Sequence, residues 1–98
     1  MSDLSQLNSA SLYPPLNLPA AQPHQLKRGV EIQTRYFFAD SIPGNKGKVV
    51  RVWQTTKGNW YVRVNFGKNQ GGQSLLKTMV LDAMALLHPS NEVRRQHD

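Results

Sequence analysis

The sequence predicts a mainly β protein: a small barrel of about five antiparallel strands with one short helical turn and a disordered N-terminal tail. Two observations carry this prediction. Valine-rich and aromatic segments between positions 30 and 66 alternate apolar with polar side chains, which is the two-residue period of half-buried strands. Clusters of Gly, Asn and Pro separate these segments, as turns between strands require. The length of 98 residues supports one compact domain at most.

Residues 1–25 are predicted to form a flexible, proline-rich tail. Four prolines lie among Ser, Asn, Gln and Ala without apolar periodicity, and proline restricts both its own backbone and that of the preceding residue. An alternative is that the stretch Tyr13-Pro14-Pro15-Leu16 acts as a short docking peptide. Residues 26–88 are predicted to form the barrel, and the polar residues 89–98 a flexible C-terminal tail.

The first strand is expected to follow a turn at residues 26–29. Alternation places four side chains on its inner side: Val30, Ile32, Thr34 and Tyr36. The three between them are expected on the outer side: Glu31, Gln33 and Arg35. A loop rich in turn-forming residues follows as far as Asn45.

Residues 46–53 and 60–66 are predicted to form a hairpin whose loop, 54–59, contains Gly58 or Asn59 at positive φ. Pairing Val52 with Val62 and Val50 with Val64 places four valines on one inner face, which Trp60 joins and Phe66 extends. The outer face then carries two directly opposed pairs, Arg51–Arg63 and Trp53–Tyr61, and also Asn65. A slip of one residue would exchange the two faces.

Residues 67–73 form a predicted loop, and residues 74–87 fit two interpretations. Apolar residues at a 3.6-residue spacing, with Ser74 as N-cap, would form an amphipathic helix. The other interpretation is a strand to about Val80, a helical turn at 81–84 and a closing strand at 85–88. The second is favoured, because three antiparallel strands alone leave an edge to be covered.

This order of elements resembles that of SH3-like barrels. Residues 44–52, with the sequence Gly-Asn-Lys-Gly-Lys-Val-Val-Arg-Val, resemble the basic second-strand motif of KOW modules, which are found in proteins that contact RNA. Residues 60–66, with the sequence Trp-Tyr-Val-Arg-Val-Asn-Phe, look like the strand that follows in Tudor- and SH3-like barrels. The resemblance covers about residues 26–88 and implies an architecture and a tendency to bind.

The charge of the chain is concentrated in the predicted barrel. The net charge is +6, but residues 26–77 contain ten basic and only two acidic side chains. Such a segment favours nucleic acid or an acidic protein as a partner, although the charge could also serve solubility alone. A homo-oligomer is a further possibility.

Residue types needed for several other functions are missing or scattered. The chain has no Cys, which excludes disulfides and thiolate metal sites. The His, Asp and Glu residues have neither metal-ligand spacing nor an arrangement for catalysis, so we expect no enzyme activity, metal or cofactor. No apolar run is long enough to cross a bilayer, and no secretory signal is evident at the N-terminus. We therefore expect no membrane association and a cytoplasmic protein.

The candidate site is the outer face of the predicted hairpin. Aromatic rings can stack on bases, and the basic groups around them can bind phosphates. The predicted nucleic-acid-binding residues are Lys48, Arg51, Trp53, Lys57, Tyr61 and Arg63. Alternatively, Trp53 packs under the 67–73 loop or at a dimer contact and the arginines are merely solvated. The expected function is binding of RNA or single-stranded DNA; the alternative is a docking adaptor for an acidic protein.

Overall fold

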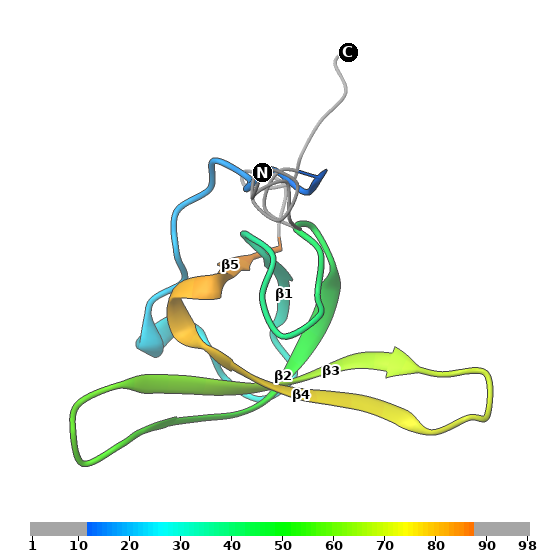
Figure 1. The fold of residues 1–98 in the computed structure, drawn as a ribbon. Coiled ribbons are helices and arrows are strands. Elements are labelled where there is room, and N and C mark those ends of the chain that lie inside the picture. Colours follow the sequence, from blue (N-terminus) through cyan, green and yellow to red (C-terminus); the bar gives the residue numbers. More distant parts are fainter. Residues whose placement is uncertain (1–11, 88–98) are drawn as a thin grey trace, which may run out of the picture.

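The computed structural model describes residues 12–87, which form one five-stranded antiparallel sheet with the strand order β4-β3-β2-β1-β5 (Figure 1). The strands are β1 (Glu31–Thr34), β2 (Lys46–Gln54), β3 (Trp60–Lys68), β4 (Ser74–Val80) and β5 (Met84–Leu86). Two 3-10 turns, η1 (Pro23–Gln25) and η2 (Leu81–Ala83), complete the elements. The predicted mainly β fold is confirmed. The described part of the chain contains no helix that is long and apolar enough to cross a membrane.

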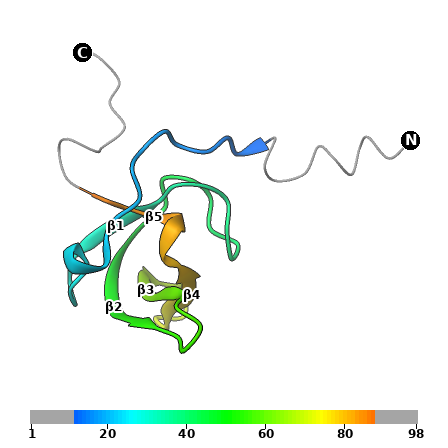
Figure 2. The same cartoon turned by 90° about the vertical axis from the view of Figure 1, so that its left-hand side faces the viewer.

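The sheet is folded over on itself rather than flat. Figures 1 and 2 show β2 curving along its length, so that β1 and β5 lie over β3 and β4. Gly47 in β2 permits a close approach to β3, because a Cβ atom there would lie 2.6 Å from Val64 Cγ1 and 2.9 Å from the Asn65 carbonyl oxygen. Any larger residue at this position would push the two strands apart.

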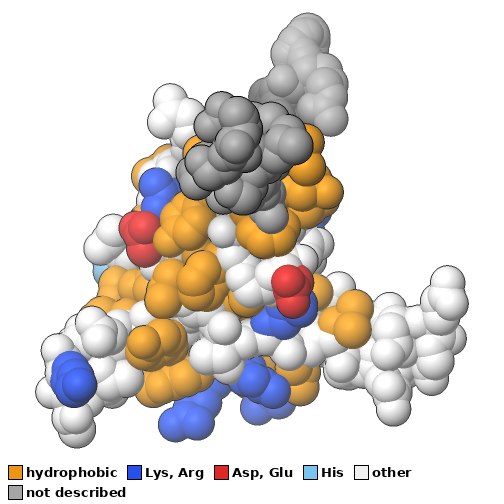
Figure 3. All heavy atoms as spheres, in the orientation of Figure 1, with side chains coloured by type: hydrophobic (Ala, Val, Ile, Leu, Met, Phe, Trp, Pro, Cys, Tyr) orange, Lys and Arg blue, Asp and Glu red, His pale blue; other side chains and the backbone are white. Residues whose placement is uncertain are grey.

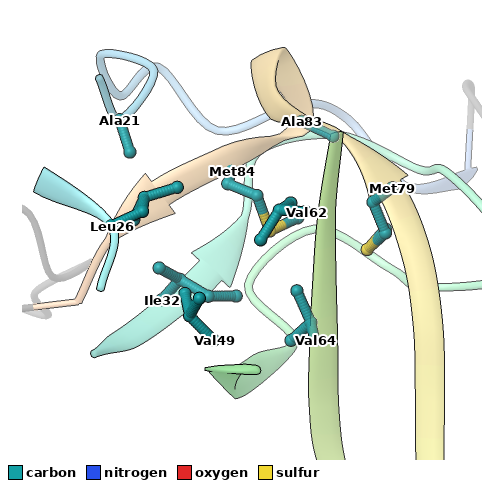
Figure 4. Packing of buried hydrophobic residues seen from close by; sticks show 9 residues of the cluster. All are labelled: Ala21, Leu26, Ile32, Val49, Val62, Val64, Met79, Ala83 and Met84. Atoms are coloured by element: carbon teal, nitrogen blue, oxygen red, sulfur yellow. The ribbon is translucent and has the colours of Figure 1, made fainter. Parts of the chain in front are cut away.

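The core fills the space between these two parts of the sheet (Figure 4). Its side chains come from all five strands, from η2 and from the segment before β1. The buried apolar residues are Ala21, Leu26, Ile32, Val49, Val62, Val64, Met79, Ala83 and Met84. The alternation in β1 and β3 therefore places the predicted residues Ile32, Val62 and Val64 inside.

The predicted hairpin register is confirmed at the turn end and is wrong at the other end. Arg51 pairs with Arg63, Val52 with Val62, and Trp53 with Tyr61. However, Val64 pairs with Val49 and not with Val50, because a β-bulge lies between Val49 and Arg51. Two residues of β2 oppose one of β3 at a bulge, so the alternation changes phase at this point.

Residues 74–87 adopt the favoured interpretation. β4 ends at Val80, the turn η2 follows at once, and β5 begins at Met84, one residue earlier than expected. β5 pairs with β1, with Met84 opposite Thr34. The buried pairing with β1 explains why apolar residues at helix-like spacing form strands here.

The segment before β1 packs on the sheet more closely than the prediction of a flexible tail implies. Ala21 is buried, and its N–H donates to the Met84 carbonyl at 2.8 Å. The N–H of Leu16 donates to the Arg35 carbonyl at 2.7 Å. The core thus includes part of a segment that composition alone placed outside it. The predicted tails at 1–11 and 89–98 lie outside the described residues.

Two further expectations about burial are corrected. Gln33 faces away from the Ile32 side of β1, but it is buried as well, so both faces of this strand are covered. Trp60 pairs with Gln54, which places it on the inner side as predicted, but it is only half-buried. The β2–β3 hairpin extends beyond the core there (Figure 1), so the inner face of the sheet has no core above it.

Candidate nucleic-acid interface

The outer face of β2, β3 and β4 brings together five of the six predicted site residues. Directly paired residues point to the same side of a sheet, so the register defines three rows across these strands. The rows are Trp53–Tyr61–Val80, Arg51–Arg63–Thr78 and Lys48–Asn65–Leu76. Figure 3 shows basic side chains gathered along the lower side of the molecule, beneath these strands.

Trp53 and Tyr61 form the aromatic part of this face. Their ring centroids are 6.0 Å apart with an interplanar angle of 27°. The guanidinium carbon of Arg51 lies 4.9 Å from the centroid of Trp53, a cation–π contact worth about 0.5–1 kcal/mol at an exposed site. Both aromatic residues are half-buried.

Arg51 and Arg63 lie opposite one another at the centre of the face. Arg63 Nη1 donates to the Thr78 hydroxyl oxygen at 2.8 Å, while Arg51 is exposed. Among the described residues, no acidic side chain forms an ion pair with Arg51 or Arg63; the ion pair that forms there joins Arg35 and Asp82. Like charges directly opposite each other destabilise a sheet, so an anion bound between them would relieve the repulsion.

The bulge in β2 aligns Lys48 with the arginines. Lys48 pairs with Asn65, which lies two residues from Arg63 on β3 and therefore on the same side. Uninterrupted alternation would have turned Lys48 inward. Lys57 lies apart from the rows, in the exposed turn at the end of the β2–β3 hairpin, and the structure does not bring it together with the other five.

Two grooves border this face, and the sequence patterns did not predict them. One, of about 400 Å³, continues the Lys48 row and is lined in part by Glu31, Lys46, Lys48, Asn65, Phe66 and Leu87. The other, of about 760 Å³, lies between η1 and the hairpin and is lined in part by Ala20, Pro23, Trp60, Tyr61, Leu81 and Asp82. Both combine segments far apart in the chain, and no local pattern marks them.

Arg35, Tyr36 and Asp82 form a polar cluster away from the outer face. Arg35 Nη1 lies 3.1 Å from Asp82 Oδ1, and the Tyr36 hydroxyl donates to Asp82 Oδ2 at 3.2 Å. Burial raises the pKa of Tyr36 above its ordinary value, and the charge of Asp82 and its hydrogen bond raise it further, while Arg35 opposes the shift. Residues 12–87 hold no group of three or more His, Asp or Glu side chains placed to bind a metal ion.

Comparisons with models of known protein families, with curated proteins and with solved structures give no match. Function must therefore be argued from the sheet, its outer face and the two grooves.

Proposed function

We propose that this protein is a non-catalytic module that binds RNA or single-stranded DNA through the outer face of β2 and β3. The observation that supports it best is the pairing of Arg51 with Arg63 beside the pair Trp53–Tyr61. The first pair offers charge to phosphates, and the second offers ring surface to bases. Stacking of one base on an aromatic side chain contributes about 1–3 kcal/mol.

This surface should bind single-stranded nucleic acid more tightly than a duplex. Rings that lie on a sheet surface can stack only on bases that are themselves uncovered. A base that stacks on the Trp53 face now contacted by Arg51 would displace the guanidinium, which would then be free to bind a phosphate. The lost cation–π contact is smaller than the gain from stacking, so the exchange is favourable.

The fold adds a weaker argument. We propose that the fold is an SH3-like barrel. Its strand order, the long β1–β2 connection and the 3-10 turn before β5 are similar to those of such barrels. Many such barrels bind nucleic acid or protein, so the fold alone does not choose between them. The basic and aromatic rows favour nucleic acid.

The test is a titration of a fluorescein-labelled single-stranded oligonucleotide of about 15 nucleotides with the full chain, followed by anisotropy at several salt concentrations. We expect the logarithm of the association constant to fall linearly with the logarithm of salt concentration, with a slope of about 0.7 per phosphate contacted. A duplex of equal length should bind more weakly. Absence of measurable binding near physiological salt would rule out the proposal.

The second candidate function is a docking adaptor for another protein, and the groove beside Trp60 favours it. A half-buried tryptophan that shares a groove with Pro23 and Leu81 is the kind of apolar surface found at the centre of protein interfaces. The basic outer face would then meet acidic side chains of the partner. Affinity purification from lysate with and without nuclease separates the two functions, because only partners held through nucleic acid are lost after digestion.

A further inference from the structure

The two edges of the sheet differ in how they are covered. β5 forms one edge, and the segment before β1 crosses it where the Ala21 N–H donates to the Met84 carbonyl. β4 forms the other edge, and among the described residues the strand that pairs with it is β3 alone. Within residues 12–87, one side of β4 therefore presents backbone N–H and C=O groups that no other strand pairs with.

β4 has few of the features that usually protect an open edge. Its seven residues, Ser74–Val80, include no proline and one charged side chain, Lys77. Leu75 and Leu76 point to opposite faces, and these two residues are 39% and 42% exposed. A seven-residue edge with a single charge and exposed apolar residues is a site for pairing with another strand.

We propose that β4 pairs with β4 of a second copy of this chain, antiparallel and about a twofold axis at Leu76. Such an axis stands perpendicular to the sheet and keeps the outer faces of both copies on the same side. Residues that pair must then be an even number apart. Centring on Leu76 places Leu76 opposite its own copy, Leu75 opposite Lys77 and Ser74 opposite Thr78.

The neighbouring registers are less favourable. Centring on Lys77 opposes two ammonium groups, and like charges directly opposite are destabilising. Centring on Leu75 leaves only three residues of each strand paired, because β4 begins at Ser74. The β3–β4 hairpin projects beyond the rest of the sheet (Figure 1), so the register at Leu76 also keeps the two bodies apart.

Head-to-tail pairing of β4 with β5 of another copy is opposed by the hydrogen bond from Ala21, which occupies the β5 edge at Met84. The twofold arrangement uses the same edge from both copies, so it closes after two chains. It also joins the two outer faces into one surface across a continuous sheet. Each chain carries a net charge of +6, so repulsion opposes pairing and added salt should strengthen it.

Analytical ultracentrifugation of the full chain tests the association. The average mass should rise with protein concentration from 11.1 kDa towards twice that value, and should rise further with added salt. Leu76→Lys should weaken association about tenfold or more. Ile42→Lys, at a residue of similar exposure in the β1–β2 loop, should leave it unchanged. A constant monomer mass at all concentrations and salts would overturn the proposal.

Cysteine cross-linking tests the register without loss of packing, because the native chain has no cysteine. Directly opposed Cα atoms lie about 4.5–5.5 Å apart in an antiparallel pair, within the range that a disulfide spans. Leu76→Cys should therefore give a covalent dimer under mild oxidation. Thr78→Cys is on the same face, but its copy would lie about 13 Å away along the strands and should stay monomeric. Equal cross-linking of both variants would refute this register.

The proposal does not depend on nucleic-acid binding. Salt should strengthen chain association and weaken oligonucleotide binding, so either property can fail without the other. Leu75→Lys, on the side of β4 away from the outer face, would oppose Lys77 of the second copy and should weaken the dimer, while a single chain still binds the oligonucleotide.

Discussion

The guanidinium of Arg35 holds the turn η2 by two contacts with one residue: Nη1 lies 2.6 Å from the Asp82 carbonyl oxygen and 3.1 Å from its carboxylate. Nε of the same group donates to the Leu18 carbonyl at 2.8 Å. Arg35 thus ties the end of β1 to η2 and to the N-terminal segment. Two of its three acceptors are backbone oxygens, so the ion pair is the smaller part of its contribution.

Replacing Arg35 should therefore lower the free energy of unfolding more than replacing Asp82. Arg35→Ala removes hydrogen bonds to two carbonyl groups, and we expect a loss of about 1–3 kcal/mol in the free energy of unfolding. Asp82→Ala removes a largely exposed ion-pair partner and should cost about 1 kcal/mol or less. Urea unfolding followed by tryptophan fluorescence measures both. A larger loss for Asp82→Ala would contradict this ranking.

Tyr36 should make stability fall in alkaline solution. Burial and Asp82 raise its pKa in the folded chain above the ordinary value of 10.0, so the folded state holds this proton more tightly than the unfolded state. The resulting stabilisation is complete below pH 10 and is lost as the pH rises through the folded pKa. Tyr36→Phe should show a shallower decline in thermal midpoint above pH 10. Identical declines in both proteins would exclude this role.

Gly47→Ala should destabilise the fold. The added Cβ would lie 2.6 Å from Val64 Cγ1 and 2.9 Å from both the Asn65 carbonyl oxygen and Phe66 Cδ1, and overpacking of this kind costs about 1–3 kcal/mol. Gly71→Ala is the matched control, because its nearest atom is Asn69 Oδ1 at 3.4 Å. Thermal unfolding of the two variants should separate clearly, and equal midpoints would show that the curve of β2 relaxes.

The double variant Arg51→Ala, Arg63→Ala tests the charged part of the outer face. It should weaken oligonucleotide binding and flatten the salt slope by about 1.5 units, the value of two phosphate contacts. Stability should stay level or rise, since opposed like charges are removed. Lys27→Ala with Arg28→Ala lowers the net charge equally at exposed positions before β1. If this control flattens the slope as much, binding follows total charge and not the outer face.

Trp53→Ala tests stacking. It should weaken binding of the same oligonucleotide by about 1–3 kcal/mol with little change in the salt slope, because stacking releases no counterions. Trp60→Ala serves as the comparison, since Trp60 lies on the inner side of the same hairpin and should leave binding unaltered. Anisotropy titrations at two salt concentrations suffice. Equal loss of affinity in both variants would mean that the outer face is not the stacking surface.

Local patterns predicted the strands well because alternation and turn residues act over a few positions. The pairs Arg51–Arg63 and Trp53–Tyr61 lie next to the hairpin turn, where the loop length limits the register. Val50 was misplaced because a bulge leaves no mark in a run of two valines. The position of Trp60 beyond the core and the burial of Ala21 depend on contacts between distant segments, so alternation could not predict them.

The candidate site was predictable where it depends on the hairpin register, and not where it depends on contacts between distant segments. Four of its residues follow from the hairpin register, and the alignment of Lys48 with them follows from the bulge. The two grooves combine residues from the N-terminal segment, β1, β2, β3 and η2, and Leu87 after β5, which come together only after the sheet has curved. Local sequence patterns therefore do not predict partners that bind in the grooves.

The bulge at Val50 lets β2 hold one residue more than the opposing stretch of β3 without exchanging its two faces. Odd and even positions exchange roles at this point: Val49 faces the core with Val52, and Lys48 faces outward with Arg51. Deleting Val50 would bring Val49 next to Arg51, and simple alternation would then keep Val49 towards the core and Lys48 outward. The chain should therefore accept either another β-branched residue at position 50 or the loss of that position, because the extra residue is taken up at the bulge and the facing of the other positions does not depend on it.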